Sequence, residues 1–210
     1  KNQIASSARF EFLITIPHLN SFNQLATLPL TKVPRDWFDR VINNPPRYAF
    51  GLDETHFHFR ATRHAAFTVH PSAESGLFQA ELWKFDVAEF FLRNPETGTY
   101  LEINLSPNGA WWSCLFTAPR QRLTDQEKPI PNVTATASHN AKKWDARISI
   151  PLEYLRKTLS FSPSSRLHSA FILDSPQRFL TTGTAPACEP NFHHPDLPAA
   201  INIDSPPRAS

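Results

Sequence analysis

Short alternations of apolar and polar residues recur along this chain and constrain its fold more than any other feature. Residues 143–150 alternate strictly, with apolar side chains on one face and Lys143, Asp145, Arg147 and Ser149 on the other. A period of two predicts a half-buried antiparallel strand. Similar runs predict further strands at residues 10–16, 56–60, 65–70, 82–92, 99–105, 110–116, 132–138, 169–174, 178–182 and 199–203.

Turn signals separate most of these runs. Clusters of Asn, Pro, Ser and Gly stand at residues 43–46, 94–98, 106–109 and 162–165. Roughly ten short strands with such punctuation are typical of an all-β fold, either a sandwich or a barrel. A short helical turn is expected over residues 151–155, because Pro151 would stand at its start, where proline is favoured.

The composition fits this fold and excludes several function classes. The chain has 20 prolines, which suit strand ends and turns, but only 5 glycines, which disfavours a glycine-loop nucleotide fold. Its formal charge of +2 comes from interleaved acidic and basic residues, which leave no basic stripe for nucleic acid. No apolar run reaches the roughly 20 residues of a membrane span. We therefore expect neither a nucleic-acid nor a membrane partner.

We expect a single domain over residues 1–203 and a flexible C-terminal tail over residues 204–210, because the strand pattern continues through the proline-rich residues 126–131 without a shift in composition. Cys114 and Cys188 allow one disulfide or two free thiols. Because neither belongs to a CxxC pair, a redox site and a zinc ribbon are both disfavoured. No signal peptide is visible, which slightly favours the cytoplasm. The compartment and the oligomeric state stay open.

Residues 82–112 carry the most informative pattern. Leu101, Ile103 and Leu105 alternate with polar side chains and should face the core, as should the apolar residues at positions 88, 90 and 92. The opposite face gathers Trp83, Glu89, Phe91, Tyr100, Glu102 and Asn104. Aromatic rings beside carboxylates and an amide are typical of sugar recognition, because rings stack on C–H faces while hydroxyls need hydrogen-bond partners. Alternatively, a loop covers this face and its rings form a second-layer core.

Four segments carry a resemblance to a known family. They are LWKFDVAEFF at 82–91, YLEINLSPNGAW at 100–111, WDARISIPL at 144–152 with Tyr154-Leu155, and PNFHHPD at 190–196. Their order resembles that of the bacterial DOMON-like proteins related to family 9 carbohydrate-binding modules, over residues 10–203. The resemblance implies an immunoglobulin-like or jelly-roll antiparallel β-sandwich. It also implies a non-catalytic module that binds a carbohydrate or a similar small polar ligand.

The resemblance also implies roles for individual residues. Family 9 modules hold a terminal sugar between two tryptophans, assisted by a carboxylate, an amide and basic side chains. Trp83 matches the first tryptophan and Glu89 matches the carboxylate. Together with the residues that alternation places on the same face, and with Trp111 as a candidate second ring, the predicted ligand-binding residues are Trp83, Glu89, Phe91, Tyr100, Glu102, Asn104 and Trp111.

Two departures from the family favour an alternative. Glu102 stands where the modules have an arginine, and residues 181–191 contain no aromatic residue to match the second tryptophan, although Trp111 or Trp112 could take its place. The alternative is a protein-interaction or structural β-sandwich whose sugar site has decayed.

Cofactor chemistry finds little support in the sequence. Structural calcium is common in the sugar modules, but no dense carboxylate loop is present here. Haem-binding DOMON relatives use methionine and histidine, and this chain has no methionine, which leaves only a His/His pair for a haem. We expect no cofactor.

Metal binding and catalysis are two further alternatives. His56 and His58 share a strand face, a geometry that two metal ligands can use, but a polar face opposite buried phenylalanines explains the same pattern. A third metal ligand would come from His64, His70, His193 or His194.

A glycosidase could use Glu89 and Glu102 as a carboxyl pair, yet no second motif supports catalysis. We therefore expect no enzyme.

Overall fold

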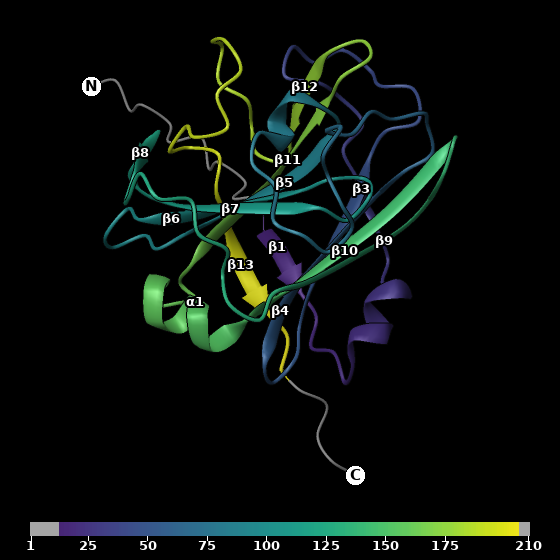
Figure 1. Cartoon of the computed structure of the whole chain (residues 1–210). Helices are drawn as coiled ribbons and strands as arrows, with labels where there is room; N and C mark the ends of the chain where they lie inside the picture. The colour runs from purple at the N-terminus through teal and green to yellow at the C-terminus, as the bar shows by residue number, and fades with distance from the viewer. Residues whose placement is uncertain (1–12, 206–210) are drawn as a thin grey trace, which may run out of the picture.

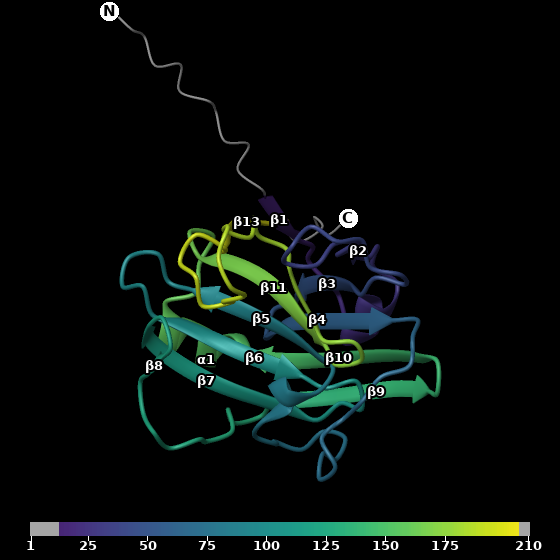
Figure 2. The same cartoon turned by 90° about the horizontal axis from the view of Figure 1, so that it is seen from above.

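The computed structural model describes residues 13–205, and they form two β-sheets packed face to face (Figures 1 and 2). The first sheet runs in the order β1 (Leu13–Ile16), β13 (Ala199–Ile203), β11 (Arg166–Leu173), β5 (Val87–Arg93), β6 (Tyr100–Leu105), β7 (Trp111–Ala118) and β8 (Gln121–Arg122), and β12 (Arg178–Thr181) also pairs with β11. The second sheet runs in the order β2 (Thr31–Lys32), β3 (Arg47–Leu52), β4 (His56–Arg63), β10 (Lys143–Pro151) and β9 (Thr134–Asn140).

Nearly all strand pairs are antiparallel, which confirms the predicted all-β antiparallel sandwich. The exception is β1, which runs parallel to β13, so that two segments far apart in the sequence lie side by side (Figure 1). Three helical segments complete the described chain: η1 (Phe22–Ala26), η2 (Leu82–Lys84) and α1 (Leu152–Leu159). None of the described helices is long and apolar enough to cross a membrane.

The main core lies between the two sheets and contains the apolar positions that the alternation placed there. The predicted set from β5 and β6 is buried in it: Ala88, Phe90, Leu92, Leu101, Ile103 and Leu105. Phe90 is fully buried, and its ring centroid lies 5.7 Å from that of Phe50, 5.5 Å from Phe57 and 5.2 Å from Phe59. The second sheet supplies all three of these partners, so one ring from β5 joins the two layers.

Turns fall where the sequence predicts them. Residues 94–98 close the β5–β6 hairpin, and residues 106–109 close β6–β7 with hydrogen bonds from Gly109 N to Ser106 O and from Ser106 N to Ala110 O. Gly109 has a φ of +89°, and a Cβ there would lie 2.9 Å from Ser75 Oγ and 3.1 Å from Ala137 N. Only glycine fits this turn without strain.

Several predicted element boundaries were wrong. The strand expected from residue 82 begins only at Val87, because Glu81 has a φ of +63° and starts the short helix η2. Residues 65–70 form no strand. The helical turn expected at 151–155 extends to Leu159. Residues 10–12 of the first predicted strand and residues 206–210 of the predicted tail lie outside the described residues.

The histidine pair on β4 has structural partners. His58 is buried, and its ring bonds Asp53 Oδ2 through Nε2 and Ser149 Oγ through Nδ1, each at 2.8 Å. The His56 ring lies stacked beside it at a centroid distance of 6.0 Å. Within residues 13–205, no group of three or more His, Cys, Asp or Glu side chains is placed to hold a metal ion. Cys114 and Cys188 are both free thiols.

Candidate ligand-binding site

The outer face of the first sheet, away from the second sheet, carries a second apolar cluster. The segment between β12 and β13 covers part of this face. It is held there by hydrogen bonds between the His168 ring and Phe192 O (3.1 Å) and from Trp37 Nε1 to Cys188 O (2.7 Å). In Figure 2 the yellow chain of this segment lies close to β11. The predicted loop cover is therefore present, but it leaves a cavity beside it.

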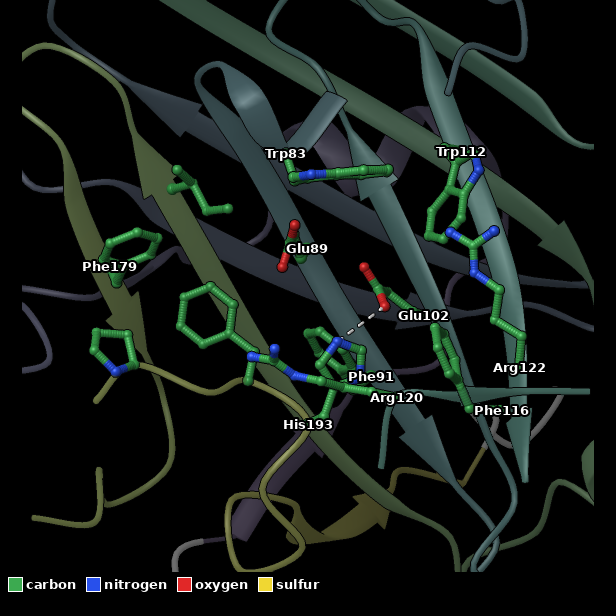
Figure 3. A pocket seen from close by; sticks show the side chains of 13 residues that line it. Trp83, Glu89, Phe91, Glu102, Trp112, Phe116, Arg120, Arg122, Phe179 and His193 are labelled. Carbon is green, nitrogen blue, oxygen red and sulfur yellow. Dashed lines mark ion pairs between the residues drawn. The ribbon is translucent and has the colours of Figure 1, made fainter. Parts of the chain in front are cut away.

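The cavity has a volume of about 370 Å³, which is within the range of small-molecule sites. Strands β5, β6, β7, β11 and β12 form its floor and sides, η2 lies at one end, and the β12–β13 segment lies at the other (Figure 3). It is lined by Trp83, Glu89, Phe91, Glu102, Trp112, Phe116, Arg120, Arg122, Ile172, Phe179, Pro190, Phe192 and His193.

Two carboxyl groups form the polar centre of the cavity. Strand register brings them together, because Glu89 on β5 pairs with Asn104 on β6 and Glu102 stands two residues before Asn104. Glu89 is 2% exposed and Glu102 is 6% exposed. With its amide nitrogen facing the two acids, Asn104 donates to Glu89 Oε1 and to Glu102 Oε1, each at 3.2 Å. One amide therefore holds one oxygen of each carboxyl group.

Burial raises the pKa of both carboxyl groups. For Glu89 the pKa lies well above its usual range because of burial and because of the neighbouring charge of Glu102. For Glu102 burial raises the pKa to about 7, although the Asn104 amide and the charges of Arg122 and Arg120 favour the ionised form. Since burial disfavours each charge and two neighbouring like charges repel each other, the pair favours a bound proton near neutral pH.

His193 brings a neutral ring to the other side of Glu102. Burial and the charges of Arg120 and Arg93 lower the pKa of His193 to about 4. The Tyr100 hydroxyl bonds His193 Nδ1 at 2.7 Å, and His193 Nε2 lies 3.8 Å from Glu102 Oε2, the contact dashed in Figure 3. When Tyr100 donates to Nδ1, the ring proton sits on Nε2. A hydrogen-bond donor then faces the carboxyl pair.

Aromatic rings and two guanidinium groups complete the cavity. The rings of Trp83 and Trp112 meet edge to face, with centroids 5.7 Å apart and planes at 64°. Trp83 is half-buried and lies on the side of the two carboxyl groups opposite His193 (Figure 3). The Arg122 guanidinium lies 5.5 Å from the Trp112 ring and 2.7 Å from Glu127 Oε1. A ligand here would meet a ring face, two acids and cationic groups.

The structure brings most, but not all, of the sequence-predicted site residues to this cavity. Trp83, Glu89, Phe91 and Glu102 line it. Asn104 and Tyr100 are buried on the same face and do not line it, and they hold Glu89, Glu102 and His193 in place instead. Trp111 lies on the opposite face, in the core between the sheets. There the Phe78 ring packs on the indole of Trp111, and Trp111 Nε1 donates to Gly76 O.

Several cavity residues were missing from the predicted site. Trp112 and Phe116 share the outward face of β7, because Trp112 pairs with Asn104 and Phe116 pairs with Tyr100. Alternation within residues 110–116 could have identified them. Arg120 and Arg122 lie in and beside the β7–β8 turn, and His193 comes from an irregular segment. No local sequence pattern marks these last three positions.

Comparisons with known proteins give distant sequence relatives. No family model matches the chain. Two mammalian proteins are 28% identical to it over 130 residues, the UPF0462 protein C4orf33 homolog of Mus musculus and the UPF0462 protein C4orf33 of Homo sapiens. The match covers 59% of this chain, and it spans 64% of the mouse protein and 61% of the human protein, less than two thirds of each.

Solved structures share the fold. A provisionally assigned carbohydrate-binding protein from Bacteroides uniformis superposes with a TM-score of 0.73 at 11% identity, over 92% of this chain and all 100% of that one. A family 9 carbohydrate-binding module from Caldicellulosiruptor kristjanssonii in complex with cellotriose gives 0.63 at 10% identity, over 94% and 96% of the two chains. Its complex with glucose gives 0.61 at 10% identity, over 95% and 99%.

These likenesses support the family 9 part of the predicted resemblance, as a shared sandwich fold. They give no support to the DOMON-like part. The sequence relatives are mammalian, so the expectation of a bacterial group is also unsupported.

Proposed function

We propose that this protein is a non-catalytic binding module that takes a carbohydrate, or a similar small polar ligand, in the cavity between Trp83 and His193. The observation that carries the proposal is the pairing of a half-buried indole with two carboxyl groups whose outer oxygens are unused. Within residues 13–205, Glu89 Oε2 and Glu102 Oε2 receive no hydrogen bond. A sugar supplies both an apolar C–H face for the ring and hydroxyl donors for these oxygens.

The solved neighbours support this proposal. Their fold holds glucose and cellotriose in the module from Caldicellulosiruptor kristjanssonii, and the sandwich of the present chain superposes on that module over nearly its whole length. The size of the cavity also suits a small sugar. No cofactor is part of the proposal.

The arrangement of the carboxyl groups favours binding over hydrolysis. A glycosidase places its two carboxyl groups on either side of the scissile bond, in different protonation states. Here Glu89 and Glu102 are joined through one Asn104 amide on the floor of the cavity, and burial raises the pKa of both. The pair acts as one hydrogen-bonding unit, which suits recognition.

Trp83→Ala is expected to weaken sugar binding by about tenfold or more, because it removes the ring face on which the sugar stacks. Isothermal titration calorimetry against a panel of neutral, amino and acidic monosaccharides, together with cellotriose, measures the change. Phe22→Ala is the matched control, since Phe22 is also half-buried but packs on His58 of the second sheet.

Equal loss of binding in both variants would point to a general structural effect rather than to a site at Trp83. If the wild-type protein binds no sugar of the panel, the proposed function is wrong. A decayed site in a protein-interaction or structural domain would then be the better description.

A further inference from the structure

The charges lining the cavity are divided unevenly. Glu89 and Glu102 lie at its centre, and each of these two residues is more than nine-tenths buried. The ion pairs among the described residues include no Lys or Arg partner for either acid. His193 contacts Glu102 at 3.8 Å, but its lowered pKa keeps it neutral near pH 7. Among the described residues, neither acid therefore has a charged partner within ion-pair distance, and the charges of Arg120 and Arg122 act on Glu102 only from farther away.

A neutral hydroxyl group would satisfy these acids only in part. It can donate one hydrogen bond, but it leaves the repulsion between two neighbouring carboxylates in place. A protonated amine supplies three donors and a positive charge, which offsets both the burial and the repulsion. Breaking a buried charge pair is strongly unfavourable, so the complementary charge is the stronger determinant of which ligand fits.

The walls of the cavity are compatible with a cation at this depth. Trp83, Phe91, Trp112 and Phe116 line it with ring surfaces, and aromatic faces attract ammonium groups, most strongly where water is excluded. Of the two guanidinium groups in the lining, that of Arg122 is paired with Glu127 at 2.7 Å, and that of Arg120 forms no ion pair with Glu89 or Glu102.

We propose that the cavity selects amino sugars, with the protonated amine of the ligand placed between Glu89 and Glu102 and the pyranose ring against Trp83. This inference rests on the proposed function and specifies its ligand class. The two free carboxyl oxygens, Glu89 Oε2 and Glu102 Oε2, are the expected acceptors of the ammonium protons. His193 Nε2 would donate to a neighbouring hydroxyl.

Binding of a cation should also release the proton that the carboxyl pair holds near neutral pH. Raising the pH ionises the acids and should strengthen binding for as long as the ligand amine stays protonated. The other titratable or charged groups around Glu102 come from several elements, and the variants below separate their effects from that of the carboxyl pair. These groups are Tyr100, Arg93, Cys114, Arg120, Arg122 and His193.

The experiment compares three pairs of sugars that differ only in the amine: glucose with glucosamine, galactose with galactosamine, and mannose with mannosamine. Calorimetry at pH 6 and pH 7, in two buffers of different ionisation enthalpy, gives the affinity and the protons released. In at least one pair the amine should bind about tenfold tighter than its neutral counterpart, with proton release and with higher affinity at pH 7.

Glu102→Gln should reduce this amine preference, measured as the ratio of amino-sugar to neutral-sugar affinity on the same variant, to about twofold or less. Glu89→Gln should act in the same direction. Glu153→Gln makes the same change of charge on the exposed surface of α1 and should leave the preference intact. Circular dichroism confirms that each variant is folded.

The outcomes separate this inference from the proposed function. If neutral sugars bind and no amino sugar binds tighter, the amine preference is wrong and the proposed function stands. The same conclusion follows if the preference survives in both Glu89→Gln and Glu102→Gln. If no sugar binds at all, both proposals fall.

Discussion

Glu102→Gln is expected to raise the free energy of unfolding at pH 8 by about 2–3 kcal/mol and to leave it nearly unchanged at pH 4. In the folded protein, burial raises the pKa of Glu102 to about 7 from an ordinary value of 4.5. Between these two pH values the folded state holds a proton that the unfolded chain has released. The wild-type protein therefore loses stability as the pH rises from about 4.5 to about 7.

Glutamine removes this loss because it is neutral at every pH, and its amide oxygen can still accept from Asn104. Urea unfolding at intervals from pH 4 to pH 8 measures the effect. The control, Glu153→Gln on the exposed surface of α1, should show no such rise. A Glu102→Gln variant that is destabilised equally at pH 4 and pH 8 would show that the carboxyl group is not a buried, destabilised acid.

Phe90→Ala is expected to lower the free energy of unfolding by about 3–5 kcal/mol, the usual loss for a large buried aromatic ring. Phe90 is fully buried, and its ring meets Phe50, Phe57 and Phe59 of the facing sheet. Its removal leaves a cavity where the two layers join. Chemical denaturation at pH 5, where the contribution of Glu102 is small, isolates this effect.

The exposed ring of Phe38 provides the comparison for this substitution. Phe38 is 52% exposed, so Phe38→Ala should change the stability by about 0.5 kcal/mol or less. If Phe90→Ala is as mild as Phe38→Ala, the two sheets do not pack through this ring.

Alternation predicts those strands that are buried on one face or whose two faces differ chemically. Residues 143–150 and the β5–β6 hairpin both follow the predicted faces, and the carboxyl groups of Glu89 and Glu102 lie together because their strands pair in the expected register. By contrast, β3 is buried at every position after Arg47, so its sequence shows no polar face and no strand was predicted there.

The cover of the cavity could not be predicted in this way. Its position depends on contacts between residues far apart in the sequence, such as Tyr100 with His193 and Trp37 with Cys188. These segments have no regular period. Trp111 and Trp112 show the same limit on a smaller scale, because neighbouring residues of a strand point to opposite faces and only the register places Trp112 beside Asn104.

Sugar binding in the cavity is tested most directly by the NMR signals of the tryptophan indole N–H groups during a titration with the neutral and amino monosaccharides. The chain has 5 tryptophans. Trp83 and Trp112 line the cavity, whereas Trp111 and Trp144 lie in the core between the sheets. The predicted result is that the Trp83 and Trp112 signals move together on one saturable curve while those of Trp111 and Trp144 stay in place. Unchanged Trp83 and Trp112 signals at saturating sugar would contradict binding in the cavity.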